Sequence, residues 1–158
     1  MPNFQIIEAK SHHCGQMARR LFTEGDPLAI SLGAAQTHRE MRVCFDGSWY
    51  VRAWLIGDKV AALGGVIGQS LSTRGYLWFV LSDLGRRHRV ALVKMLLAQI
   101  NNLKEIHPEL ILTVTDDSAS QARNARFAGF LGFQQVPGTT RVGLLRHKAL
   151  TFRHREAA

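Results

Sequence analysis

A cluster of basic residues near the middle of the chain has the composition and position of a phosphate-binding site. The apolar residues 76–81 are short enough for a strand, residues 82–85 form a turn, and Arg86-Arg87-His88-Arg89 opens a long helix with an apolar stripe. The first N–H groups of a helix have no partner inside it, and the positive end of the helix dipole lies there. Basic side chains in a first turn oppose that dipole, which favours a phosphate-bearing ligand over a solvated basic surface.

Carboxylates suited to accept a proton follow two predicted strands. Asp83 comes directly after the first of them, and Asp116 and Asp117 follow the buried strand expected over residues 110–115. An aspartate in such a place can act as a general base or cap the next helix, and capping is the more frequent use. Tyr76 could donate a proton, with core packing as the alternative.

The spacing of the histidines and cysteines indicates no metal site. His12 and His13 are adjacent, so they cannot share one helical face as ligands. Cys14 and Cys44 match no metal motif, and we expect both to be small buried side chains, with a reactive thiol as the alternative. Large aromatics on predicted strands usually fill a core, which applies to Trp49, Trp54 and Trp78.

Length and composition limit the class of protein. The 158 residues, 46% of them hydrophobic, predict a single domain spanning residues 1–158, with a solvated basic tail at about 147–158. No apolar run approaches the ~18 residues of a membrane span, and Met1-Pro2-Asn3 does not begin a signal peptide. We therefore expect a cytoplasmic protein with no membrane association. The net charge of +8 would attract an anionic cofactor, an acidic protein or nucleic acid, and nucleic acid is supported by charge alone.

Apolar periodicity predicts the elements that position these residues. A first strand over residues 4–9 precedes a helix capped by Ser11. A second helix begins at Asp26-Pro27 and continues to Met41, with Gly33 as its weak point. The later elements are strands over 48–56, 60–69 and 76–81, with a hairpin turn at Gly57-Asp58-Lys59 between the first two. They are followed by a helix stopped by Pro108, a strand over 110–115, a helix ended by Gly132, and a hairpin around Pro137-Gly138.

That order, with a phosphate-type turn after the fourth strand, resembles the GNAT superfamily of acyl-CoA-dependent N-acetyltransferases. The resemblance covers residues 4–145. It implies an α/β (α+β) fold in which a mixed, mostly antiparallel sheet of six to seven strands is flanked by about four helices. It also implies acetyl-CoA as the cofactor.

The diphosphate motif of the superfamily, Gln/Arg-x-x-Gly-x-Gly/Ala, aligns with residues 86–91. Arg89 replaces the central glycine, which in the family lets the backbone approach the diphosphate. The arginine side chain could obstruct that approach or turn outward and pair with a phosphate oxygen. The resemblance implies that the diphosphate is bound by Arg86, Arg87, His88, Arg89, Val90 and Ala91. It further implies that pantetheine pairs with the backbone of Phe79, Val80 and Leu81.

A second family motif is a helix that ends in Gly-Phe, here Gly132-Phe133. The family asparagine near its start is replaced by Gln121, and the family tyrosine, often the general acid, is replaced by Ala128. The resemblance implies cofactor contacts from this helix by Gln121, Asn124 and Phe127. Arg126-Phe127 before the Gly-Phe end, together with Trp78, also resembles a phage and prophage branch that includes virion-associated proteins.

Two functions follow from the resemblance. The first is acetyl transfer from acetyl-CoA to a primary amine of a small molecule or protein, by direct attack in a ternary complex, with Asp83, Tyr76 and Asp116 as candidate catalytic residues. The alternative is a catalytically inactive virion-associated or interaction protein. The resemblance places the amine acceptor near the first two helices, and a homodimer could form through residues 142–145.

Overall fold

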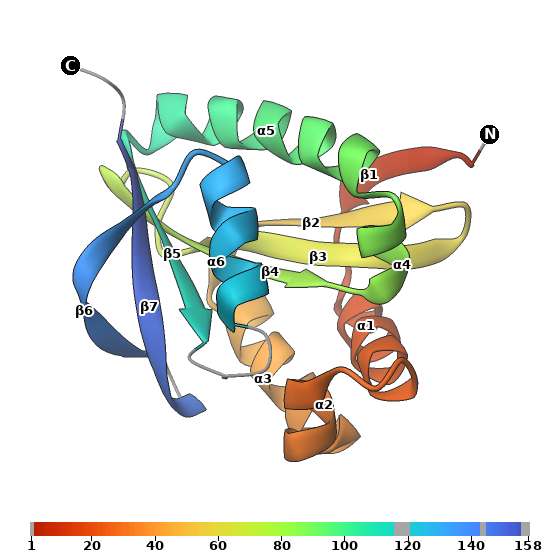
Figure 1. The fold of residues 1–158 in the computed structure, drawn as a ribbon. Coiled ribbons are helices and arrows are strands. Elements are labelled where there is room, and N and C mark those ends of the chain that lie inside the picture. Colours follow the sequence, from red (N-terminus) through yellow and green to blue (C-terminus); the bar gives the residue numbers. More distant parts are fainter. Residues whose placement is uncertain (1, 116–120, 143–144, 156–158) are drawn as a thin grey trace. The chain divides into compact units, whose positions relative to one another are not determined.

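The computed structural model describes residues 2–115, 121–142 and 145–155 of the chain (Figure 1). These residues fall into two compact units, the first made of the described residues up to Ile67 together with Trp78–Leu92, and the second of Gly68–Leu77 together with the described residues from Val93 onward. The described helices are α1 (Ser11–Thr23), α2 (Pro27–Leu32), α3 (Ala34–Asp46), α4 (Asp83–Arg87), α5 (Arg89–Ile106) and α6 (Gln121–Phe130). The strands are β1 (Phe4–Glu8), β2 (Ser48–Ile56), β3 (Lys59–Ile67), β4 (Arg74–Leu81), β5 (Glu109–Thr115), β6 (Gln134–Val142) and β7 (Leu145–Arg155).

The first unit is a sheet in the order β1-β2-β3-β4 with helices α1 and α3 packed on one face (Figure 1). β2 pairs antiparallel with β1 and with β3, and Gly57 turns the β2–β3 hairpin at φ 63°, as its sequence predicts. Alternate residues of these strands face the helices, which places the core on that side. Its fully buried members include Cys14, Met17, Ala53 and Leu63.

The helical part of the first unit differs from the prediction at two points. The helix expected from Leu28 to Met41 is broken at Gly33, which adopts φ 84° and separates α2 from α3. The break is stable because the Gly33 carbonyl accepts both the N–H and the hydroxyl of Thr37, which lies in the first turn of α3. The predicted cap Ser11 was also wrong, because Lys10 is the N-cap and the ring of His13 accepts its N–H at 2.8 Å.

The second unit is a sheet in the order β4-β5-β7-β6. β4 pairs in parallel with β5 from Arg74↔Glu109 to Leu77↔Leu112, and β7 pairs antiparallel with β5 and with β6. The basic segment that the sequence places in a tail from about residue 147 belongs, as far as Arg155, to strand β7. The predicted turn at Pro137-Gly138 was wrong, since it lies inside β6 at a shift of register, where proline is tolerated.

The structure confirms the predicted fold class and supplies more helices than expected. Seven strands form the described sheet, and the additional helices are α2, separated at Gly33, and the short α4. α5 ends at Ile106, directly before His107 and Pro108, as predicted. None of the helices in the described part of the chain combines the length and apolar character needed to cross a bilayer.

Candidate functional site

The basic segment after β4 forms two helices where one was predicted. α4 ends at Arg87, His88 has the non-helical angles φ −112° and ψ 34°, and α5 begins at Arg89. The long helix therefore starts three residues later than the sequence suggests. The reason lies in Ser82, whose carbonyl accepts the N–H of Arg86 and closes an earlier turn.

Ser82 anchors this turn to the sheet. Its side chain is fully buried, and its hydroxyl donates to the Ala61 carbonyl at 2.6 Å while accepting the N–H of Gly85 at 3.2 Å. Its own N–H also donates to Ala61. Asp83 was expected to be either a general base or a helix cap, and the N-cap of α4 is Ser82 instead. A serine before an acidic first turn is a capping signal that could have identified it.

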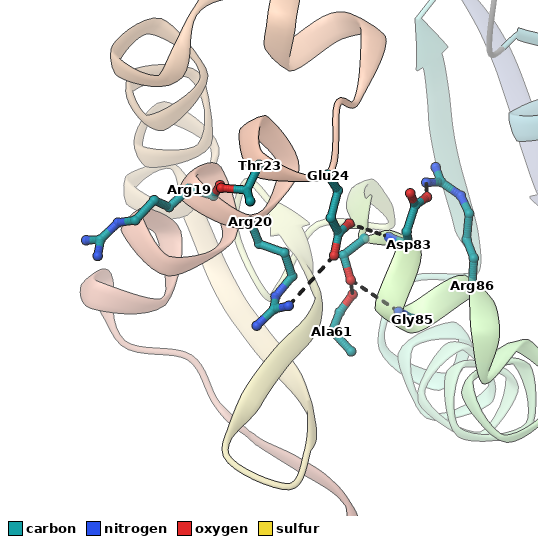
Figure 2. A network of polar contacts seen from close by, with 9 residues as sticks. Arg19, Arg20, Thr23, Glu24, Ala61, Asp83, Gly85 and Arg86 are labelled. Atoms are coloured by element: carbon teal, nitrogen blue, oxygen red, sulfur yellow. Dashed lines mark hydrogen bonds and ion pairs between the residues drawn. The ribbon is translucent and has the colours of Figure 1, made fainter.

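The carboxylate of Glu24 occupies the start of α4 (Figure 2). Its Oε2 accepts the backbone N–H of Asp83 at 2.7 Å, and its Oε1 lies 3.7 Å from the guanidinium of Arg20. Glu24 is the C-cap residue of α1, so this contact joins α1 to α4 within the first unit. Sequence reasoning missed it because the two residues are 59 positions apart.

The sequence predicts unpaired backbone N–H groups at a helix that begins at Arg86. In the structure the corresponding groups lie at the start of α5, which begins at Arg89. Leu92 is the first residue of this turn whose N–H returns to the chain, at 3.1 Å from the His88 carbonyl. The N–H groups of Arg89, Val90 and Ala91 precede it and have no acceptor inside the helix. The side chains of Arg89 and Val90 are exposed.

The arginine in the glycine position of the motif fits without backbone strain. No described non-glycine residue has a positive φ, so Arg89 occupies ordinary helical backbone. Its side chain is exposed to solvent. Within the same segment Arg86 pairs with Asp83 at 3.0 Å, and the His88 ring meets Phe4 edge-on at 5.5 Å.

The backbone of Phe79, Val80 and Leu81 lies in β4 beyond Leu77, where the parallel pairing with β5 ends. Phe79 packs edge-on against the buried Trp54 at 5.6 Å. The Trp78 indole N–H donates to the Ser48 hydroxyl at 2.8 Å. These contacts confirm the packing role predicted for Trp54 and Trp78.

The predicted proton-transfer residues fall in separate parts of the chain. Asp83 belongs to the first unit and keeps a side chain that is 48% exposed beside Arg86. Tyr76 belongs to the second unit, where its hydroxyl and the Glu109 carboxylate raise the pKa of the Arg74 guanidinium. Asp116 and Asp117 lie outside the described residues.

Helix α6 ends as predicted. Gly132 adopts φ 88°, and the N–H of Phe133 returns to the Ala128 carbonyl at 3.1 Å. Ala128, in the position of the family tyrosine, is fully buried and carries no group that could donate a proton. Gln121 is the first residue of the helix, and the cofactor candidates Asn124 and Phe127 are both half-buried.

The two cysteines have the properties of packed thiols. Cys14 is fully buried, and burial raises its pKa. Cys44 is partly buried, and burial, followed by the Glu40 carboxylate, raises its pKa to about 11. Among the described residues, no three His, Cys, Asp or Glu side chains are grouped closely enough to hold a metal ion.

The raised pKa of Cys44 predicts a loss of stability in alkali. An unfolded thiol titrates near pH 8.5, so between about pH 9 and 11 the unfolded chain releases a proton that folded Cys44 retains. The free energy of unfolding should fall across that window and should be unaffected by this group at lower pH. Melting temperatures at pH 8 and 10 would test this, since Cys44→Ala should show a smaller fall than the wild type. An equal fall would contradict it.

Comparison with known proteins identifies the fold. No sequence family and no curated protein matches the chain. Among solved structures, RimL, an α-N-acetyltransferase of ribosomal L7/L12 in complex with coenzyme A, matches with a TM-score of 0.64 at 11% identity, covering 96% of this chain and 93% of its own. The microcin C7 self-immunity acetyltransferase MccE, with acetyl-CoA and AMP, matches at 0.65 and 8% identity, covering 97% and 92%. A GNAT-family acetyltransferase from Streptococcus pneumoniae matches at 0.56 and 16% identity, covering 96% and 98%. At these identities the likeness establishes the fold.

Proposed function

Starting from the GNAT fold of this chain, we propose that it is an acetyl-CoA-dependent N-acetyltransferase. The observation that carries the proposal is the first turn of α5, where the N–H groups of Arg89, Val90 and Ala91 have no intrahelical acceptor beside exposed basic side chains. RimL and MccE, which share the fold, hold coenzyme A or acetyl-CoA. The residues present fit a diphosphate at this turn.

The side chains of the turn would each have a distinct part in binding. The outward Arg89 can pair with a phosphate oxygen without blocking the backbone, since it needs no glycine conformation. Arg86 now pairs with Asp83, and it can exchange that carboxylate for a phosphate. The backbone of Phe79, Val80 and Leu81 offers strand hydrogen bonds to an extended pantetheine arm.

The chemistry requires a base for the incoming ammonium and an acid for the departing thiolate. When bound, acetyl-CoA supplies the thioester carbonyl that a primary amine attacks. Asp83 is our candidate base, because its carboxylate is exposed and would be released if Arg86 turned to a phosphate. Tyr76, with an exposed side chain, is the candidate acid, and Asp116 is a further candidate base outside the described residues. The acceptor is a primary amine of a small molecule or of a protein.

Charge reversal at Arg89 tests the binding step. We expect the wild type to bind acetyl-CoA with micromolar affinity in isothermal titration calorimetry, and Arg89→Glu to weaken binding by about tenfold or more, because a carboxylate would face the diphosphate. Arg19→Glu is the matched control, since this exposed arginine of α1 points away from the turn (Figure 2). It should change the affinity by less than about twofold.

The same titration separates this function from its alternative. Absence of wild-type binding at millimolar acetyl-CoA would overturn the enzyme proposal and favour a virion-associated or interaction protein with this fold. Equal weakening by Arg19→Glu and Arg89→Glu would show that overall charge, and not the α5 turn, attracts the ligand. Binding that Arg89→Glu weakens selectively would justify a screen of amine acceptors.

A further inference from the structure

Glu24 joins the end of α1 to the start of the turn that leads into α5, and none of the motifs accounts for it. We propose that Glu24 is a positioning residue that holds this turn in the conformation required for acyl-CoA. The inference rests on the proposed function, because it concerns the same binding turn. Glu24 itself would touch neither the acetyl group nor the amine.

The Glu24 carboxylate is fixed from both sides. Its Oε2 accepts the Asp83 N–H at 2.7 Å, and its Oε1 faces Arg20 at 3.7 Å (Figure 2). The side chain is 20% exposed, and the backbone N–H of Glu24 donates to the Arg20 carbonyl at 2.9 Å. A carboxylate with separate partners on its two oxygens has little rotational freedom, so it can define the position of the Asp83 backbone.

Helix α4 needs such support because it has only five residues. A helix of that length does not hold its shape in isolation. At its start the Glu24 carboxylate accepts the N–H of Asp83, and Ser82 accepts the N–H groups of Gly85 and Arg86. Its end leads through His88 directly to the first turn of α5. A displacement at Asp83 therefore reaches the proposed diphosphate groups within a few residues.

Two effects of Glu24 on an anionic ligand have opposite signs. Its negative charge would repel a nearby diphosphate, whereas its hydrogen bond pre-organises the turn and so reduces the ordering cost of binding. Glu24→Gln removes the charge but retains an oxygen that can accept the Asp83 N–H. Glu24→Ala removes both. The pair of substitutions thus distinguishes positioning from electrostatic repulsion.

The experiment measures acetyl-CoA affinity by calorimetry together with amide exchange by NMR. For Glu24→Ala we expect the Kd to rise about tenfold and the Asp83 amide to exchange at least about tenfold faster. Glu24→Gln should restore both to within about twofold of wild type. Arg19→Ala, an exposed change on the same helix, should alter neither. Once an acceptor is known, Glu24→Ala should raise KM for acetyl-CoA with kcat nearly unchanged.

The outcomes separate this inference from the proposed function. Wild-type binding that Glu24→Ala leaves unchanged would overturn the positioning role and leave the enzyme proposal intact. If Glu24→Ala and Glu24→Gln both bound acetyl-CoA more tightly than the wild type, the positioning role would be overturned, and the main effect of Glu24 would be repulsion of the diphosphate. Absence of binding by the wild type would remove the proposed function and this inference with it. If Glu24→Ala does not fold, Glu24→Asp decides the matter, since its shorter reach should weaken binding while its charge remains.

Discussion

Replacement of Gly65 by alanine is expected to lower the free energy of unfolding by about 3 kcal/mol, because β3 leaves no space for a side chain there. An added Cβ would overlap the Tyr50 carbonyl oxygen and come within 3.0 Å of the Trp78 indole nitrogen. The carbonyl belongs to the backbone of the neighbouring strand β2, which pairs with Gly65 through Val51 and cannot rotate away. Glycine at this position is what allows the two strands to approach so closely.

Urea unfolding would measure the effect of Gly65→Ala against a matched substitution. A Cβ added to Gly129 on α6 would meet nothing within 4 Å, so Gly129→Ala should be neutral or stabilise the protein by up to about 1 kcal/mol. The same chemical change should therefore have opposite signs at the two positions. If Gly65→Ala proved as stable as the wild type, β2 and β3 would have to be able to separate at this point, which would contradict the prediction.

The second large effect is expected for Ser82→Ala, which should lower the free energy of unfolding by about 2 kcal/mol. The substitution removes the acceptor of the buried Gly85 N–H and the donor to Ala61, in a place that water does not reach. Because Gly85 packs closely on Ala61, the alanine variant cannot shift α4 to find another partner.

Thr23→Val provides the control for Ser82→Ala. The Thr23 hydroxyl also donates to a carbonyl, that of Arg19 at 2.8 Å, but it is exposed, so water can replace its hydrogen bond. Its loss should change stability by less than about 0.5 kcal/mol. Similar losses for both variants in thermal unfolding would argue that the Ser82 contacts contribute no more than a surface hydrogen bond.

Periodicity was sufficient to predict the order of strands in the first unit. The apolar character of β2 and the turn at Gly57 are local properties of the sequence, and the structure reproduces both. The helix boundaries failed at Gly33 and His88, where one residue leaves helical geometry. The break at Gly33 depends on hydrogen bonds that Thr37 donates, and the break at His88 depends on the Ser82 carbonyl, which accepts the N–H of Arg86. The apolar spacing is helical on both sides of each break, so it does not indicate them.

The second unit shows a different limit. The Lys, Arg and His of the last residues suggested a basic tail and gave no indication of a strand, because such residues have little intrinsic preference for strands. β7 is nevertheless the strand between β5 and β6, and its pairing partners in β5 lie more than 30 residues away. Non-local pairing of this kind leaves no periodic signal in a charged segment.

The candidate site was predictable as a segment but not as a set of contacts. The motif located residues 86–91 at a helix start, and the structure confirms that a helix starts within them. The Glu24 carboxylate on Asp83 and the Ser82 hydroxyl on Ala61 join parts of the chain that lie 59 and 21 residues apart. Such contacts require the tertiary fold, and sequence spacing alone does not indicate them.

The break at His88 has an evolutionary consequence. Because the backbone enters α5 at ordinary helical angles, position 89 is released from the demand for glycine and can accept any L-amino acid. The charge and size of the side chain at position 89 can then change during evolution without altering the backbone of the first turn of α5. Lysine, glutamine or serine at position 89 should keep the same backbone while changing the affinity of the turn for anions.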